Sequence, residues 1–276
     1  MKPTIAFLAA ILLMFGVTDL RAQVGPDYVL EMDEINVTEY SDHIFSNFIV
    51  EYPKEADATW KRIYQNDILA RIENFFAEEN PEMVFRLSDS DSIEAALKDL
   101  SGRLIRKTET LTSADTTLWE HDYKGERYYF NFGLQVEAIP LEGTDIASFH
   151  LMASEYKPWG ERERNFEAWC SYDMQTGSKV GLRDIMQLEG FPALREAIEQ
   201  FVTFFQLGDN AGKLLIRDCE REIPLPSEYD IALVSGTLRY SYPKDALVRG
   251  SATSGMIPIE MIKDYLTPKA KKALGL

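Results

Sequence analysis

The order in which strand and helix patterns follow one another constrains the fold of this chain most. Strand patterns, rich in alternating or β-branched apolar residues, cover 44–52, 127–139, 145–156, 165–172, 231–233, 237–242 and 255–259. Segments with helical periodicity occur singly between runs of consecutive strands. Adjacent strands broken by single helices favour antiparallel sheets over alternating βαβ units. The sequence therefore predicts an α+β protein, with antiparallel sheets and a few packed helices in two intimately associated subdomains.

Three segments have helical periodicity. Apolar residues recur about every four positions through 57–79, which predicts a long amphipathic helix. A second helix is predicted over 191–206, with Pro192 in its first turn, where the missing N–H costs nothing. A third, shorter helix is predicted over 92–104, with Asp91 as its N-cap.

The first 22 residues have the pattern of a secretory leader. Lys2 precedes an uncharged apolar run, Thr4–Val17, and the small residue Ala22 offers a cleavage point. This run is shorter than the roughly 20 residues that cross a bilayer core. We expect cleavage, export to the periplasm or beyond, and no stable membrane insertion afterwards. An uncleaved N-terminal anchor is the alternative.

The chain is acidic, with a formal net charge of −16. Such a surface repels nucleic-acid phosphates and anionic lipid head groups. It favours a cationic partner, for example a basic protein, and it equally serves plain solubility. We therefore expect no nucleic-acid partner.

Two cysteines, Cys170 and Cys219, allow a single pairing. Export into an oxidising compartment makes a disulfide between them possible. The alternative is two separate buried thiols, because free cysteine packs as a small hydrophobe. One pair of cysteines lacks the ligands of a zinc site, so no metal or other cofactor is expected.

The usual catalytic motifs are missing. His43, His121 and His150 are the three histidines, and none lies in an H-E-x-x-H pattern. The chain contains no G-x-S-x-G elbow, Walker A or G-x-G-x-x-G sequence. A pair of catalytic carboxylates, as in glycosidases, is defined by separation in space and stays open. The pattern favours a protein without catalysis of its own.

Aromatic residues gather between positions 119 and 132. A strand directs Tyr129 away from the face that Tyr128 and Phe130 share. Flat aromatic faces bind sugar rings and anchor protein interfaces. Trp119, Tyr129 and Trp159 are therefore the candidate binding residues, against the alternative that all the aromatics fill the core.

Three segments resemble a family of exported bacterial proteins. The strand Phe48–Pro53 and the helix after it resemble the opening of the domain DUF4163. Residues 172–185 are similar to a turn-and-helix motif of that family, and 229–266 resemble the end of the domain DUF3298. The family's Gly-Gly-Ala-His stretch is replaced here by residues 157–162, which lack the histidine.

The resemblance implies a leader over 1–22, a DUF4163-like subdomain over 23–157 and a DUF3298-like subdomain over 158–276. Such modules occur alone, beside a peptidoglycan deacetylase domain, or as the lysozyme-sensing ectodomain of an anti-sigma factor. The expected function is an exported, non-catalytic binding module of the cell envelope. Its partner would be cell-wall glycan or a basic protein such as a lysozyme-like hydrolase. A glycan hydrolase with a carboxylate pair and a structural envelope protein are the alternatives.

Overall fold

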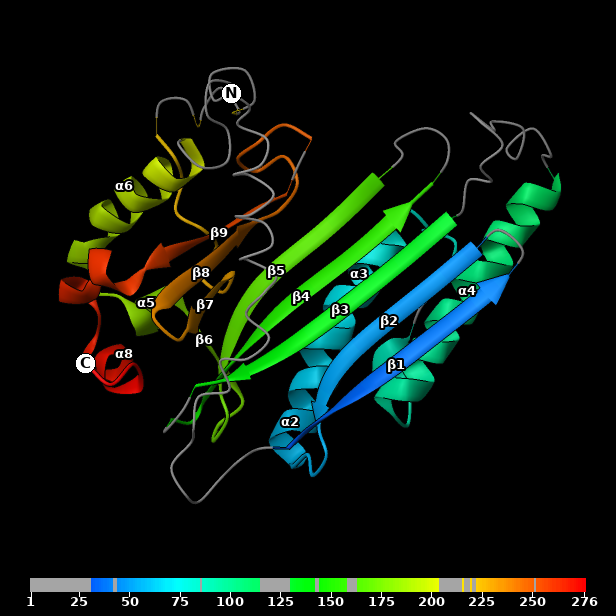
Figure 1. The fold of residues 1–276 in the computed structure, drawn as a ribbon, viewed down its shortest axis with the longest axis horizontal. Helices are drawn as coiled ribbons and strands as arrows, with labels where there is room; N and C mark the ends of the chain where they lie inside the picture. Colours follow the sequence, from blue (N-terminus) through cyan, green and yellow to red (C-terminus); the bar gives the residue numbers. More distant parts are fainter. Residues whose placement is uncertain are drawn as a thin grey trace, which may run out of the picture. The chain divides into compact units, whose positions relative to one another are not determined.

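The structure is a computed structural model that describes residues 31–41, 44–84, 86–114, 130–141, 144–157, 163–203, 215, 219, 222–250 and 252–276. Residues Glu31–Leu276 make up one compact unit. Within the described residues, one sheet of six strands and one of three are combined with helices (Figure 1). The predicted α+β class with mostly antiparallel sheets is confirmed. The predicted leader lies outside the described residues.

The strands of the larger sheet follow one another in chain order from edge to edge. They are β1 (Met32–Ser41), β2 (Ile44–Pro53), β3 (Phe130–Pro140), β4 (Ile146–Tyr156), β5 (Glu163–Asp173) and β6 (Ser178–Val180). Neighbours are antiparallel except β2 and β3, which run parallel. A parallel pair needs a long crossover, and the helices between β2 and β3 provide it. The strand patterns for β2 to β5 are confirmed to within a few residues.

One long helix follows β2, as predicted over 57–79. It consists of α2 (Ala58–Ile63), a π-helical turn η1 (Tyr64–Ile68) and α3 (Leu69–Glu78). Asp57 caps its start, because its carboxylate accepts hydrogen bonds from the backbone N–H groups of Thr59 (2.8 Å) and Trp60 (2.9 Å). A short 3-10 turn, η2 (Leu87–Asp89), then leads to the next helix.

The next helix, α4 (Ile93–Ala114), is longer than the predicted 92–104. The hydroxyls of Thr108 and Thr112 donate to carbonyls four residues back, at 2.9 Å and 2.8 Å, which allows these polar residues to be buried. Because the buried positions of this part of the helix are polar, the sequence shows no apolar periodicity there. The predicted Asp91 cap was wrong. Ser92 is the cap, because its hydroxyl accepts from the N–H of Ala95 at 3.1 Å.

These helices cover one face of the six-stranded sheet (Figure 1). Phe48 of β2 and Phe132 of β3 contact Phe76 of α3, with ring centroids 5.9 Å and 6.5 Å apart. Phe149 of β4 contacts Trp60 in the same layer. Alternate residues of the strands point to the opposite face, where many side chains are only half-buried.

The smaller sheet is antiparallel throughout. Its strands are β7 (Ile231–Val234), β8 (Thr237–Tyr242) and β9 (Thr253–Pro258), as the patterns predicted. The accompanying helices and turns are α5 (Leu182–Ile185), η4 (Leu188–Gly190), α6 (Phe191–Phe201), η7 (Ile259–Met261), η8 (Lys263–Tyr265) and α8 (Pro268–Ala273). Of these, α5, α6, η7 and α8 share one apolar core with the sheet. The helix predicted over 191–206 is confirmed through Phe201.

The predicted subdomain boundary, 157/158, falls between β4 and β5, which pair along their whole length. Strands from both sides of the boundary therefore build the larger sheet, while the smaller sheet lies within 158–276. The division into two subdomains stays a prediction. None of the helices in the described part of the chain has the length and apolarity that a membrane crossing requires.

Candidate functional site

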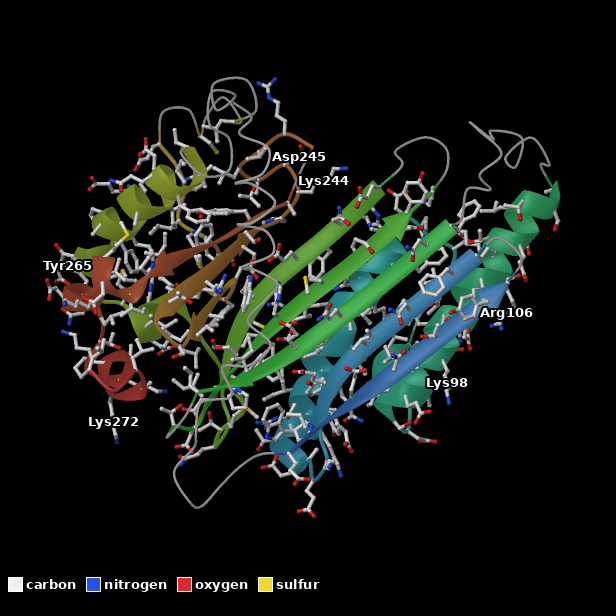
Figure 2. All side chains as sticks on the ribbon, in the orientation of Figure 1. Lys98, Arg106, Lys244, Asp245, Tyr265 and Lys272 are labelled. Atoms are coloured by element: carbon white, nitrogen blue, oxygen red, sulfur yellow. The ribbon has the colours of Figure 1, made fainter. Side chains whose placement is uncertain are left out.

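A groove of about 670 Å³ lies on the face of the larger sheet that the helices leave uncovered. Strands β2 to β5 form its floor, and Lys244, Gly250 and Ala252 line it from the connection between β8 and β9. Figure 2 labels Lys244 on that connection. The groove thus lies where the open face of one sheet meets a loop of the other.

The groove lining mixes neutral polar side chains with apolar ones. Amide and hydroxyl groups come from Asn47, Asn131, Gln135, Ser154 and Asn165, and apolar surface comes from Phe45, Ile49 and Met152. Amides both donate and accept hydrogen bonds. Such a lining fits a ligand that carries many hydroxyl or amide groups on an otherwise apolar frame.

Because Gly133 of β3 has no side chain, the hydroxyl of Ser154 on β4 can lie close to the backbone of β3. Gly133 pairs directly with Ser154 of β4. A Cβ atom at position 133 would lie 2.6 Å from Oγ of Ser154, closer than real contacts allow. Glycine at this strand position therefore marks a close approach rather than a turn.

A histidine between two glutamates lies beside the groove. Nδ1 of His150 is 3.4 Å from a carboxylate oxygen of Glu137, and Nε2 is 2.9 Å from one of Glu167. The imidazole stacks on Trp169, with ring centroids 3.9 Å apart and planes 10° from parallel. Strands β3, β4 and β5 contribute these residues to one face of the sheet, and Glu167 lines the groove itself.

The electrostatics of this cluster favour a charged imidazole. Burial opposes protonation of His150, but its hydrogen bonds to Glu137 and Glu167 outweigh burial and raise its pKa above the usual value. The hydrogen bond from His150 lowers the pKa of Glu137. Burial works against the charge of Glu167, yet its bonds from His150 and Ser254 lower its pKa as well. The two carboxylates thus stabilise the protonated form of the imidazole, and the imidazole in turn stabilises their ionised forms.

Glu167 also joins the two sheets. Its second oxygen accepts a hydrogen bond from the hydroxyl of Ser254 in β9, at 2.5 Å. The next outward residue of β5, Trp169, donates its backbone N–H to the hydroxyl of Ser241 in β8, at 3.2 Å. The guanidinium of Arg239 lies 5.2 Å from the centroid of the Trp169 ring. These contacts close one end of the groove.

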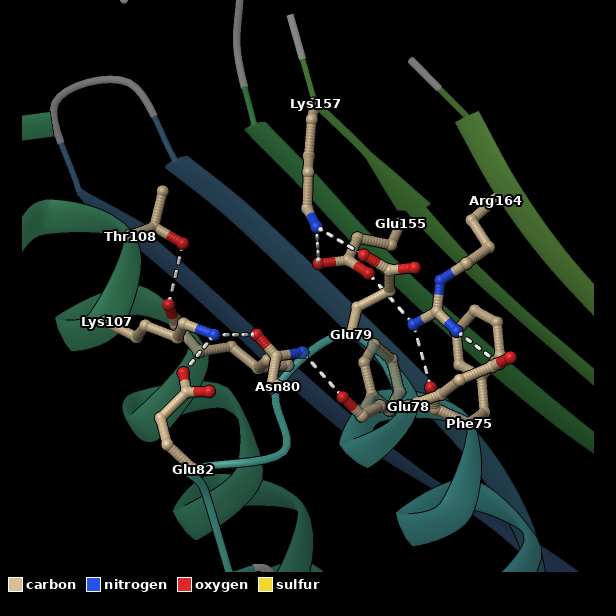
Figure 3. A network of polar contacts seen from close by, with 12 residues as sticks. Phe75, Glu78, Glu79, Asn80, Glu82, Lys107, Thr108, Glu155, Lys157 and Arg164 are labelled. Atoms are coloured by element: carbon tan, nitrogen blue, oxygen red, sulfur yellow. Dashed lines mark hydrogen bonds and ion pairs between the residues drawn. The ribbon is translucent and has the colours of Figure 1, made fainter. Parts of the chain in front are cut away.

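A second polar network fastens α3 beneath β4 and β5 (Figure 3). The buried guanidinium of Arg164 donates to the carboxylate of Glu155 (3.0 Å), to Glu78 (2.9 Å) and to the carbonyl of Phe75 (2.7 Å). Lys157 lies 3.3 Å from the same Glu155. Arg164 belongs to the residues that line the groove, so this network supports the strand on which the groove depends.

The aromatic binding residues expected from the sequence, Trp119, Tyr129 and Trp159, lie outside the described residues, as do His43 and His121. The sequence has no local signal that marks His150 among the histidines, because neither Glu137 nor Glu167 is near it along the chain. Only the register shows the cluster: Glu137 pairs directly with His150, and Glu167 is a diagonal neighbour, paired with Met152.

Both cysteines are buried thiols in the structure. Cys170 lies on β5, and burial raises the pKa of its thiol to about 12. The Sγ atom of Cys219 is 3.6 Å from the carbonyl oxygen of Ala246. The sequence allowed either a disulfide or two separate buried thiols. The structure has two separate thiols.

The described residues include no group of histidine, cysteine, aspartate and glutamate side chains arranged to hold a metal ion. Near neutral pH, Glu137 and Glu167 are ionised, whereas the general acid of a glycosidase must hold its proton. The groove lining offers neutral hydrogen-bonding groups and apolar contact beside the charged side chains of Glu163, Glu167 and Lys244.

Two solved structures resemble this chain along most of its length. One is a DUF3298 family member from Bacteroides fragilis, with 15% identity and a TM-score of 0.54, covering 89% of this chain and 96% of that one. The other is a DUF3298 family protein from Pseudomonas aeruginosa, with 13% identity and a TM-score of 0.51, covering 89% of this chain and 98% of that one. The chain has the fold of DUF3298 proteins. It matches no protein-family model and no curated protein.

Proposed function

We propose that this DUF3298-like chain is an exported binding module that holds cell-wall glycan in the groove on the open face of the larger sheet. The leader-like pattern over 1–22 supports export to the periplasm or the cell exterior. The lining of the groove carries the proposal. Neutral amide and hydroxyl groups alternate there with apolar surface, which matches the hydroxyls, acetamido groups and apolar ring faces of amino sugars.

Charge argues for glycan over a basic protein at this groove. Its lining includes the acidic side chains of Glu163 and Glu167 but also the basic side chain of Lys244, whereas the guanidinium of Arg164 lies on the helix side and is paired with Glu155 and Glu78. A surface that attracts a lysozyme-like protein by charge would be dominated by carboxylates. The net charge of −16 keeps such a protein as the second candidate, acting elsewhere on the surface.

Isothermal titration with soluble glycan fragments tests the proposal. The double variant Asn131→Ala/Gln135→Ala removes two amides from the lining and is expected to weaken binding about tenfold, at about 1 kcal/mol or less for each lost hydrogen bond. Gln200→Ala is the matched control, because Gln200 is an exposed amide on α6 outside the groove. Affinity that is equal in all three proteins would reject the groove as the site.

Two further outcomes separate the alternatives. Retention of the protein on immobilised lysozyme but not on glycan, lost at high salt, would replace the proposal with the basic-protein candidate. Release of reducing sugar from the fragments would establish a hydrolase. The finer resemblance, a DUF4163-like subdomain over 23–157 akin to a lysozyme-sensing ectodomain, belongs to the same proposal. It is the reason for testing lysozyme beside glycan.

A further inference from the structure

Among the described residues, no strand is hydrogen-bonded to the edge of β5 that runs along the groove. The short strand β6 pairs only with Ser171–Asp173 at the far end of β5. Over Glu163–Glu167, the described residues place β4 on one side of β5 and no hydrogen-bonded strand on the other, whereas at Trp169 the backbone already contacts Ser241 of β8. Five consecutive residues of this stretch, Glu163 to Glu167, line the groove.

The backbone groups on this edge are identified by the strand alternation. The N–H of Trp169 points outward to Ser241, and the carbonyl of Asp173 points outward to the N–H of Gly177. The pairing of β4 with β5 runs from Tyr156↔Glu163 to Ile146↔Asp173 without a slip. Outward N–H and C=O groups therefore belong to every second residue, including Asn165 and Glu167. Within the described residues, no hydrogen bond is made to the outward backbone groups of Asn165 and Glu167, whereas those of Trp169 and Asp173 have partners.

An edge of this kind accepts an extended peptide as an additional strand. The free stretch is short, because the contacts of Ser241 and Ser254 with Trp169 and Glu167 close one end. Five residues of strand span about 17 Å, at roughly 3.4 Å per residue. The edge therefore suits a peptide of a few residues rather than a strand of a folded protein.

The same groove presents two surfaces of different chemistry. The open face of β3 and β4 carries the amide and hydroxyl groups of Asn131, Gln135 and Ser154, and the wall carries the free backbone of β5. A ligand that fills the groove meets both. We infer that the groove binds a saccharide carrying a short peptide, whose backbone pairs with the β5 edge at Asn165 and Glu167. This inference rests on the proposed function and names its ligand as a peptide-bearing glycan of the cell wall.

The test compares peptide-bearing glycan fragments with the same fragments after an amidase has removed the peptide, by isothermal titration. Two added backbone hydrogen bonds of about 1 kcal/mol each predict at least tenfold tighter binding of the peptide-bearing form. Asn165→Pro removes the outward N–H, and proline is tolerated on a strand edge. Compared with Asn165→Ala, this variant is expected to bind the peptide-bearing form about fivefold more weakly, because it lacks one backbone hydrogen bond of about 1 kcal/mol, and to bind the peptide-free form equally well.

Asn165→Ala is the matched control, because it removes the side chain and keeps the N–H. It is expected to retain the preference for the peptide. A second measurement needs no variant: amide hydrogen exchange at Asn165 and Glu167 in the wild type is expected to slow when the peptide-bearing fragment is added, and not with the peptide-free one.

The outcomes distinguish the inference from the function on which it rests. Equal affinity for both forms, with unprotected amides, overturns the peptide inference and leaves glycan binding intact. Binding of neither form overturns both. Protection of the two amides by a basic peptide without sugar, at equal affinity, overturns the inference in favour of a protein partner.

Discussion

Nε2 of His150 lies 2.9 Å from Oε1 of Glu167, and the same carboxylate holds Ser254 of the smaller sheet at 2.5 Å. Glu167 is thus hydrogen-bonded both to His150 on β4 and to Ser254 of the other sheet, so the charge of the histidine affects the contact between the two sheets. Glu137 approaches the imidazole from β3, while Arg239 on β8 lies over Trp169 and helps to lower the pKa of Glu137. Protonation of His150 is therefore coupled to how firmly this end of the groove is held.

This coupling predicts a pH dependence of stability. The pKa of His150 is raised in the folded state, so its contribution is complete below the unfolded value of about 6.5 and is lost as pH rises through the folded pKa. The lowered pKa values of Glu137 and Glu167 give a contribution that is present above about pH 4.5 and lost as pH falls through their folded values.

Urea unfolding across this range measures the effect. The free energy of unfolding of the wild type relative to His150→Gln is expected to decrease as the pH rises above about 6.5 and through the folded pKa of His150. An NMR titration of His150 gives the folded pKa directly. A difference between the two proteins that is constant across this range, or a titration below the unfolded value, would contradict the coupling.

Arg164 and Glu155 predict a large loss of stability when one partner is removed. Only 8% of the Arg164 side chain and 2% of the Glu155 side chain are exposed. Arg164→Met leaves a buried carboxylate with Lys157 as its remaining cation, and we expect a cost of about 3 kcal/mol. Arg183→Met is the control, because Arg183 is 76% exposed beside Glu228 and should change stability by less than about 1 kcal/mol. Similar unfolding curves for the two variants would show that the Figure 3 network is not a stabilising element.

Much of the fold is readable from the sequence, because its elements have local causes. The helix from Ala58 to Glu78 carries its own cap and apolar stripe, and β2 to β5 alternate clearly. The missed elements lack such signals. Most residues of β1 are partly or fully exposed, and β6 has three residues, so neither shows the alternation of a half-buried strand.

The candidate site is less readable, because it depends on register. His150 meets Glu137 and Glu167 only once two hairpins have fixed which residues of β3, β4 and β5 are neighbours. The edge of β5 that has no paired strand among the described residues likewise follows from the short length of β6, which no local pattern reveals. The residues that line the groove are brought together by strand pairing, whereas the sequence pattern pointed to aromatic residues as the binding residues.

The two thiols predict a simple chemical test of the disulfide that the sequence allowed. Burial raises the pKa of Cys170 to about 12, so that its thiolate is scarce and shielded at neutral pH. Native protein is expected to react slowly with Ellman's reagent. After denaturation without reductant, the purified protein should expose two reactive thiols, whereas a bridge between Cys170 and Cys219 would leave none.

Gly133 and Ser154 predict a coupled pair of substitutions beneath the groove. Gly133→Ala places a methyl group against Oγ of Ser154, 2.6 Å away, so one of them must move. We expect a loss of about 1–2 kcal/mol in unfolding free energy, as for other overpacked sites. Ser154→Ala removes the opposing atom, and the double variant should recover most of that loss. A double-mutant cycle in urea measures the coupling. Additive effects of the two substitutions would mean that the strands adjust without cost, and that glycine at this position is not required for the close approach.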